Sequence, residues 1–132
     1  MLSRNELIEL VEKRYFSVMD QGQLDETLAC LATDCVWHIY PAGTVLTGRD
    51  HEIRNAFADA MARYETMWHG NFQWTIDEAT QRVAASFDVR LVDKAGKEIE
   101  LSNVKLFQVK DGRFPRLDLY FSTTDAIVAK PS

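Results

Sequence analysis

The chain has 132 residues, the size of one domain, and its 46% hydrophobic and 27% charged residues are typical of a globular protein. The net charge of −5 argues against a nucleic-acid partner, because a phosphate backbone needs a basic protein face. No apolar run reaches the roughly 18–20 residues that span a bilayer, and the N-terminus lacks the apolar core of a secretory signal. We therefore expect one cytoplasmic domain over residues 1–132 with no membrane partner.

The first part of the chain predicts two helices. Ser3 and Glu6 have the spacing of a capping box, and Gly22 predicts the end of the helix that begins there. Apolar residues repeat at three and four positions between these points, and Tyr15 is the only one with a polar tip. Its hydroxyl is expected either at the rim of the core or in a pocket. Residues 24–31 predict a second, short helix.

A short strand is predicted before Pro41, because proline cannot donate a hydrogen bond to a strand ladder. Alternation gives this strand two faces, one with Val36, His38 and Tyr40 and one with Cys35, Trp37 and Ile39. We expect His38 and Tyr40 to point into the protein interior. The spacing of the two cysteines fits neither a redox motif nor a zinc site, so both are expected to be buried free thiols.

The remaining chain predicts one helix and then only strands. After an irregular segment at 42–48, Asp50 can cap a third helix, with His51 in its first turn. Alternating residues then predict strands at 67–77, 83–91, 98–109 and 114–121, joined in part by turns at 93–96 and 111–112. Three helices with an early strand and four long antiparallel strands predict an α+β fold.

This order of elements resembles the nuclear transport factor 2-like fold. The sequences Val-Trp-His-Ile at 36–39, Leu-Thr-Gly-Arg-Asp at 46–50 and Lys-Asp-Gly-Arg-Phe at 110–114 carry the resemblance. They are similar to its SnoaL-like branch, which includes polyketide cyclases, ketosteroid isomerases and limonene epoxide hydrolases. The resemblance implies a cystatin-like cone, in which a curved antiparallel sheet and three N-terminal helices surround an apolar cavity. It also implies a small hydrophobic ligand, no cofactor, and a homodimer formed through the sheet face.

The resemblance also marks pocket positions. Ketosteroid isomerases use a tyrosine on the first helix, which Tyr15 matches, and two acids, whose places are taken by Tyr40 and Lys105. Limonene epoxide hydrolases carry an aspartate before a final Tyr-Phe pair, where this chain has Leu119. Neither set of carboxylates is matched, so the resemblance leaves open whether the chain is an enzyme.

Two groups of residues are candidates for chemistry. His38 with Tyr15 and Tyr40 could move a proton on a carbonyl substrate, or His38 could only hydrogen-bond a ligand or core group. Asn103 and Lys105 share a strand face with apolar residues. A lysine in that setting could have a lowered pKa, bind an anion or form a Schiff base, or it could reach the rim or pair with an acid.

Further candidates for ligand contacts are Trp68, Trp74, Asp118 and Tyr120. The tryptophans could line an apolar cavity or belong to the core. Asp118 could pair with Arg116 on the outer or dimer face, or a bulge near Pro115 could turn it into the cavity. A metal held between His38 and His69 lacks further ligands at a familiar spacing, so no metal is expected.

These observations lead to three hypotheses. The first is an isomerase, cyclase or lyase acting on a small hydrophobic carbonyl compound. The second is a non-catalytic module that binds such a compound. The third is a domain that serves only in dimerisation.

Overall fold

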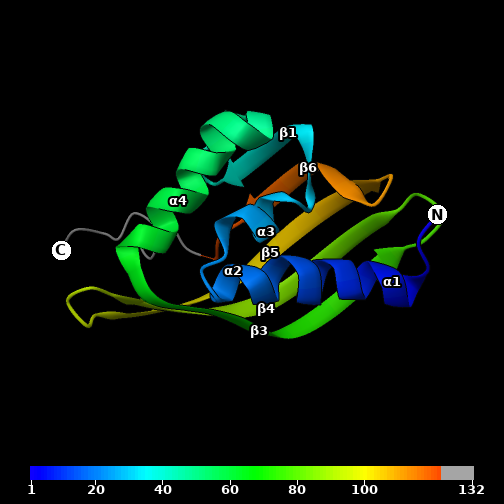
Figure 1. Cartoon of the computed structure of the whole chain (residues 1–132). Coiled ribbons are helices and arrows are strands. Elements are labelled where there is room, and N and C mark those ends of the chain that lie inside the picture. The colour runs from blue at the N-terminus through cyan, green and yellow to red at the C-terminus, as the bar shows by residue number, and fades with distance from the viewer. Residues whose placement is uncertain (123–132) are drawn as a thin grey trace.

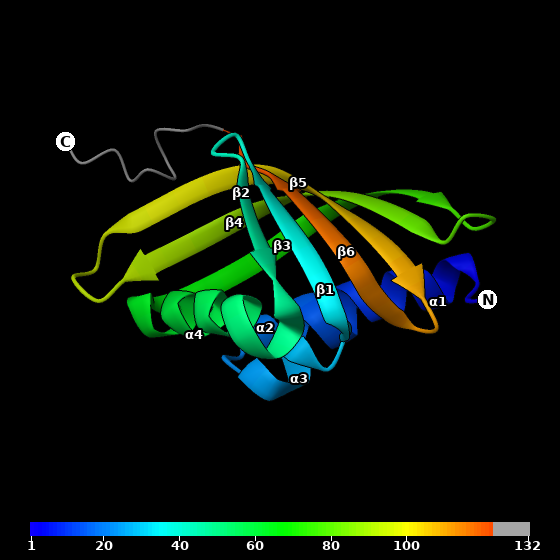
Figure 2. The ribbon, with the colours of Figure 1, turned by 90° about the horizontal axis from the view of Figure 1, so that it is seen from above.

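The computed structural model describes residues 1–122, and its helices all lie against one face of a curved six-stranded sheet (Figures 1 and 2). The N-terminal helix runs through α1 (Arg4–Glu9), a π-helical segment η1 (Leu10–Ser17) and α2 (Val18–Asp20). The capping box is confirmed: the Ser3 side chain accepts from the Glu6 N–H, and the Glu6 carboxylate accepts from the Ser3 N–H. The helix α3 (Leu24–Leu28) is shorter than predicted. The segment η2 (Gly48–Ile53), which is broken at His51, leads into α4 (Arg54–Arg63).

The sheet has the order β2-β1-β6-β5-β4-β3. Its strands are β1 (Leu31–Tyr40), β2 (Thr44–Thr47), β3 (Tyr64–Asp77), β4 (Arg82–Asp93), β5 (Glu98–Lys110) and β6 (Arg113–Tyr120). All neighbours are antiparallel except β1 and β6, which are parallel. The α+β prediction is confirmed, and the sheet is mixed rather than wholly antiparallel.

One predicted irregular segment is instead a strand. Residues 44–47 form β2, which pairs with the end of β1. Gly43 has a φ of +75°, which glycine adopts without strain, and its N–H donates to the Ile39 carbonyl. The chain therefore reverses sharply after β1 and adds a sixth strand at the sheet edge.

The face of the sheet that contacts the helices is called the inner face, and the opposite face the outer face. In the register of β1 and β6, Trp37 lies beside Leu117 and Ile39 beside Leu119, and the two leucines are buried in the core. The face with Cys35, Trp37 and Ile39 is therefore the inner one. The prediction that His38 and Tyr40 point into the interior is wrong, because the face of β1 without a polar side chain is the one that packs against the helices.

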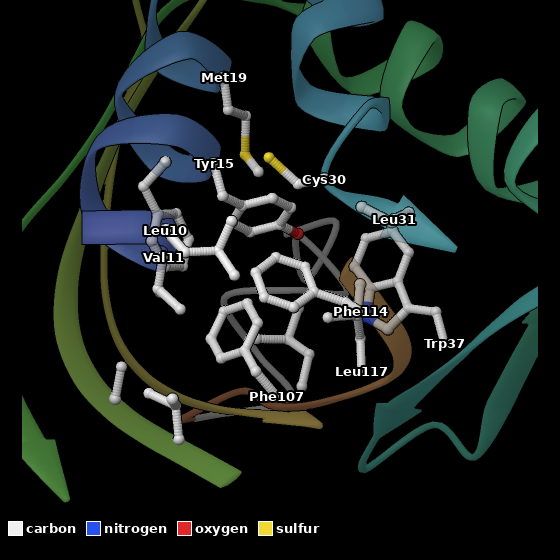
Figure 3. Close-up of a cluster of buried hydrophobic side chains, with 14 of the residues drawn as sticks. Leu10, Val11, Tyr15, Met19, Cys30, Leu31, Trp37, Phe107, Phe114 and Leu117 are labelled. Carbon is white, nitrogen blue, oxygen red and sulfur yellow. The ribbon is translucent and has the colours of Figure 1, made fainter. Parts of the chain in front are cut away.

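Aromatic rings fill the space between the N-terminal helix and the inner face. Figure 3 shows the Tyr15 ring beside Phe107 and Phe114, with Trp37 in the same buried cluster. Tyr15 meets both phenylalanines edge to face, with ring centroids 5.4 Å apart in each case. Such edge contacts add to the stabilisation from burial. No helix in the described part of the chain has the length and apolar character needed to cross a membrane.

Candidate functional site

The inner face of β5 carries a lysine that is almost completely removed from solvent. Lys105 is 3% exposed, and its Nζ donates a hydrogen bond to the Tyr15 hydroxyl on η1. Aromatic ring centroids surround Nζ at 4.5 Å (Trp37), 4.7 Å (Tyr15), 5.8 Å (Phe57 and Phe107) and 5.9 Å (Phe16). Within residues 1–122 no carboxylate forms an ion pair with it. Lys105 thus does not reach the rim, and it pairs with no acid in the described residues; these were two of the alternatives that the sequence left open.

A second donor beside Lys105 lacks an acceptor. Trp37 is 8% exposed, and its Nε1 is buried with no hydrogen-bond partner among the residues that the structure describes. Its ring stacks on Phe57 with centroids 5.0 Å apart, which fixes the direction of the indole. Buried donors in proteins are normally paired. Lys105 Nζ donates to Tyr15 and lies over the Trp37 ring, and these three side chains are hereafter called the donor cluster. Within it, the Trp37 N–H is the donor without an acceptor in the described residues.

Burial controls the protonation of this region. Desolvation lowers the pKa of Lys105 from 10.5 to about 7, and the nearby Cys35 thiol opposes this shift. Desolvation raises the pKa of Tyr15 well above 10, and it raises the pKa of Cys35 to about 12. At neutral pH the lysine can therefore exchange a proton, while the tyrosine keeps its hydroxyl hydrogen and remains a donor.

Asn103 lies on the same face of β5, two residues before Lys105. It is buried, and its side-chain Oδ1 accepts a hydrogen bond from the backbone N–H of Ser122 at 3.3 Å. This contact holds the chain just after β6 against β5. Asn103 is thus next to the donor cluster, and its side-chain carbonyl oxygen is already hydrogen-bonded to Ser122.

The predicted catalytic group of His38, Tyr40 and Tyr15 is not assembled. His38 and Tyr40 lie on the outer face, and their rings are stacked with centroids 6.2 Å apart. Tyr40 also stacks on Tyr120 at 4.6 Å. The sheet itself separates these rings from Tyr15.

Asp118 also lies on the outer face, in line with His38 in the register of β1 and β6. Arg116 donates to both of its carboxylate oxygens, at 2.9 and 3.0 Å, so the ion-pair alternative is confirmed. Together with Tyr40, Tyr120 and Leu106, this pair lines a groove of about 630 Å³. The predicted ligand contacts Asp118 and Tyr120 therefore belong to an outer-face groove and not to the interior.

The two tryptophans predicted to contact a ligand lie in different surroundings. Trp68 is 36% exposed, with the Arg90 guanidinium 5.3 Å from its ring centroid. Trp74 is half-buried against the core and stacks on Phe72 at 5.2 Å. The two side chains do not line one common cavity with the donor cluster.

A half-buried acid–histidine pair joins the helices to the sheet. The Nδ1 atom of His69 lies 2.6 Å from Asp20 Oδ1, and the His69 backbone N–H donates to the other oxygen at 2.8 Å. The ring packs on Phe16 with centroids 4.8 Å apart. His69 is thus in the core region while His38 is on the outer face, so the two cannot share a metal. Within residues 1–122 no three His, Cys, Asp or Glu side chains are grouped as metal ligands.

Comparison with known proteins identifies the family. Residues 13–116 match the SnoaL-like domain. The chain belongs to the SnoaL-like domain family. No curated protein matches this SnoaL-like domain.

Solved structures share the fold of this SnoaL-like domain. A candidate polyketide cyclase from Xanthomonas campestris pv. campestris has a TM-score of 0.82 at 23% identity, with 98% of each chain covered. A nuclear transport factor 2-like protein of unknown function from Burkholderia pseudomallei has a TM-score of 0.80 at 18% identity, with 99% of this chain and 100% of the other covered. A protein of ketosteroid isomerase-like fold from Catenulispora acidiphila, in complex with trimethylamine, has a TM-score of 0.77 at 14% identity, covering 91% and 90%. The nuclear transport factor 2-like fold is therefore shown.

Two features of the site escaped the sequence reasoning. Trp37 was assigned to the face opposite the pocket, although its apolar strand face was the signal for burial. Asp20 and His69 are 49 residues apart, and no local pattern connects them. The contact between Asp20 and His69 becomes visible only once the helices are placed on the sheet.

Proposed function

We propose that this SnoaL-like domain binds a small hydrophobic carbonyl compound at the donor cluster and moves a proton on it, as an isomerase, cyclase or lyase does. The observation that carries the proposal is the unpaired N–H of Trp37 beside a buried lysine that has no carboxylate partner in the described chain. A carbonyl or enolate oxygen accepts hydrogen bonds and donates none, so it complements a group of donors.

The three side chains have distinct roles in this proposal. Trp37 and Tyr15 donate to the oxygen on which negative charge develops, as the donors of an oxyanion hole do. Lys105 carries the proton, because a group with a pKa of about 7 is present in both its acidic and basic forms at neutral pH. Lys105 thereby takes the role of proton carrier, which was predicted for His38.

A ligand must displace side chains to reach the donor cluster. Lys105 is 3% exposed, and Tyr15 and Phe107 are also buried. A compound that fits there replaces contacts between aromatic rings, so a flat, apolar ligand is favoured over a hydrated one. The names of two structural relatives, a candidate polyketide cyclase and a ketosteroid isomerase-like protein, support this class of ligand.

The proposal is tested with a panel of cyclic enones, each paired with the alcohol of the same ring. We expect the ketones to raise the melting temperature more than the alcohols, and the wild-type protein to catalyse exchange of the hydrogens next to the carbonyl in D₂O, as followed by NMR. Tyr15→Phe removes one donor and should weaken ketone binding roughly five- to fifteenfold. Tyr64→Phe is the matched control, because Tyr64 lies outside the donor cluster.

The outcomes separate the hypotheses. Binding without hydrogen exchange under any condition means that the domain is a binding module and not an enzyme. If no compound of the panel binds, or if Tyr15→Phe binds the ketones as tightly as the wild type, the donor cluster is not the site.

We also propose that the chain forms a homodimer through the outer face. Three exposed apolar side chains lie together there: Val104 (40% exposed) faces Tyr120 (42%) across β5 and β6, and Leu106 (37%) is two residues further along β5. In the part of the chain that the structure describes, no helix covers this face (Figure 2). Apolar patches of this kind commonly mark protein interfaces. Light scattering should then give twice the chain mass of 15.1 kDa, whereas a monomer at micromolar concentration contradicts the proposal.

A further inference from the structure

The position of Lys105 has a consequence beyond hydrogen bonding. Its amine is the only aliphatic amine among the described residues that is buried in the core; Lys110 on the same strand is exposed, and Lys13 on η1 points to solvent beside Glu12. The aromatic rings around Nζ do not neutralise a charge as a carboxylate does, so burial disfavours the ammonium form.

We propose that Lys105 forms a covalent imine with a small hydrophobic aldehyde or ketone bound at the donor cluster. This inference rests on the proposed function, since it requires the carbonyl compound to occupy that site. It makes the amine a nucleophile toward the carbonyl carbon, whereas the proposal above needs it only as a proton carrier.

The surroundings of Nζ suit this reaction in three ways. The side chain is held by the Tyr15 hydroxyl and by ring faces, with the nearest centroids at 4.5 and 4.7 Å, so the amine is positioned. The apolar surroundings also favour a hydrophobic carbonyl compound over water. Finally, the pKa of about 7 leaves about half of the amine neutral at pH 7, roughly a thousandfold more than for an ordinary lysine.

Formation of the imine needs only the amine and the carbonyl compound, and it releases one water molecule. The nitrogen lone pair attacks the carbonyl carbon, a C–N bond forms, and the carbonyl electron pair moves to oxygen. One N–H proton passes to that oxygen to give a neutral carbinolamine. Loss of the hydroxyl as water, with a second proton from nitrogen, then forms the C=N bond. Tyr15 touches Nζ and keeps its proton, so it is placed to relay a proton between nitrogen and oxygen.

The experiment uses benzaldehyde with sodium cyanoborohydride, which reduces an imine to a stable secondary amine. The wild-type protein is labelled at pH 7, and the site is mapped by peptide mass spectrometry. We expect benzylation of Lys105 to exceed that of Lys110 at least about tenfold, given the difference in neutral amine. Lys105→Met should abolish the fast labelling, and the matched control Lys110→Met on the same strand should keep it. Tyr15→Phe should slow it while circular dichroism shows an unchanged fold.

Benzyl alcohol, which cannot form an imine and should bind more weakly than benzaldehyde, distinguishes failure of the imine from failure of the proposed function. If benzyl alcohol and benzaldehyde stabilise the wild type but Lys105 is not labelled faster than Lys110, the imine is wrong and the carbonyl-binding site stands. If neither compound binds and labelling is confined to exposed lysines and the Met1 amine, both proposals are wrong. Fast labelling of Lys105 that persists in Tyr15→Phe at the same rate overturns the proton relay.

Discussion

Replacing Lys105 with methionine should stabilise the protein at neutral pH. It should also abolish the increase in the free energy of unfolding with pH that Lys105 causes in the wild type. Folding moves the Lys105 amine from water into the aromatic core and lowers its pKa from 10.5 to about 7. Between these two values the unfolded chain binds more protons than the folded one, so the free energy of unfolding increases with pH in this window. From pH 7 to 8.5 the lysine contributes an increase of about 1.6 kcal/mol.

The two cysteines change the free energy of unfolding with pH in the opposite direction. Their contribution is small between pH 7 and 8.5. Burial raises the pKa of Cys30 to about 11 and that of Cys35 to about 12, from 9, so the unfolded chain loses these protons first. Stability therefore falls as the pH approaches 9, and up to pH 8.5 the two thiols together remove only about 0.3 kcal/mol. Lys105→Met keeps both thiols, so the difference between the wild type and this variant isolates the lysine.

The assay is urea denaturation of the wild type, Lys105→Met and the exposed control Lys110→Met at several pH values from 7 to 8.5. At pH 7 we expect Lys105→Met to be more stable than the wild type by about 1–4 kcal/mol, because an apolar side chain replaces a desolvated amine that is charged in about half of the molecules. Its stability should not rise with pH, whereas that of Lys110→Met should follow the wild type. Parallel pH profiles for the wild type and Lys105→Met would refute the reasoning that this amine is desolvated.

Three further expectations concern other parts of the molecule. Trp37→Phe should change the free energy of unfolding by less than about 1.5 kcal/mol, since the loss of contacts is offset by removal of an unpaired N–H, yet it should weaken ketone binding in calorimetry. Leu106→Arg should convert the proposed homodimer to a monomer in light scattering without loss of fold, while Ala62→Arg on the helix layer should leave the proposed homodimer intact. In Gly70→Ala, a new Cβ would lie 2.1 Å from the Trp68 ring, so the variant should lose about 1–3 kcal/mol of stability and change its tryptophan fluorescence.

The fold was predictable because its signals are local and repeated. The capping box at Ser3 and Glu6 begins the first helix as expected, and the long strands show clear alternation. The strand β2 escaped prediction because four residues are too few for a periodic signal. The parallel pairing of β1 with β6 also escaped, because these strands lie some 80 residues apart and nothing in either one specifies its neighbour.

The site was predictable only in part, for a reason that β1 illustrates. Alternation assigned its residues to two faces correctly, but did not say which face meets the helices. His38 and Tyr40 were expected to face the interior because their side chains could take part in chemistry. The face of β1 that is buried is instead the apolar one that contains Trp37. Lys105 was the opposite case: it is a charged residue on a strand face that it shares with Asn103 and with apolar residues, and the structure places it in the core.

The most direct test of the central claim is a crystal structure of the protein with a bound cyclic enone. We expect the carbonyl group at the donor cluster, with its oxygen within hydrogen-bond distance of Trp37 Nε1 and Tyr15 or its carbon bonded to Lys105 Nζ. A ligand found only in the outer-face groove beside Tyr120, with the aromatic packing around Lys105 unchanged, would contradict the claim.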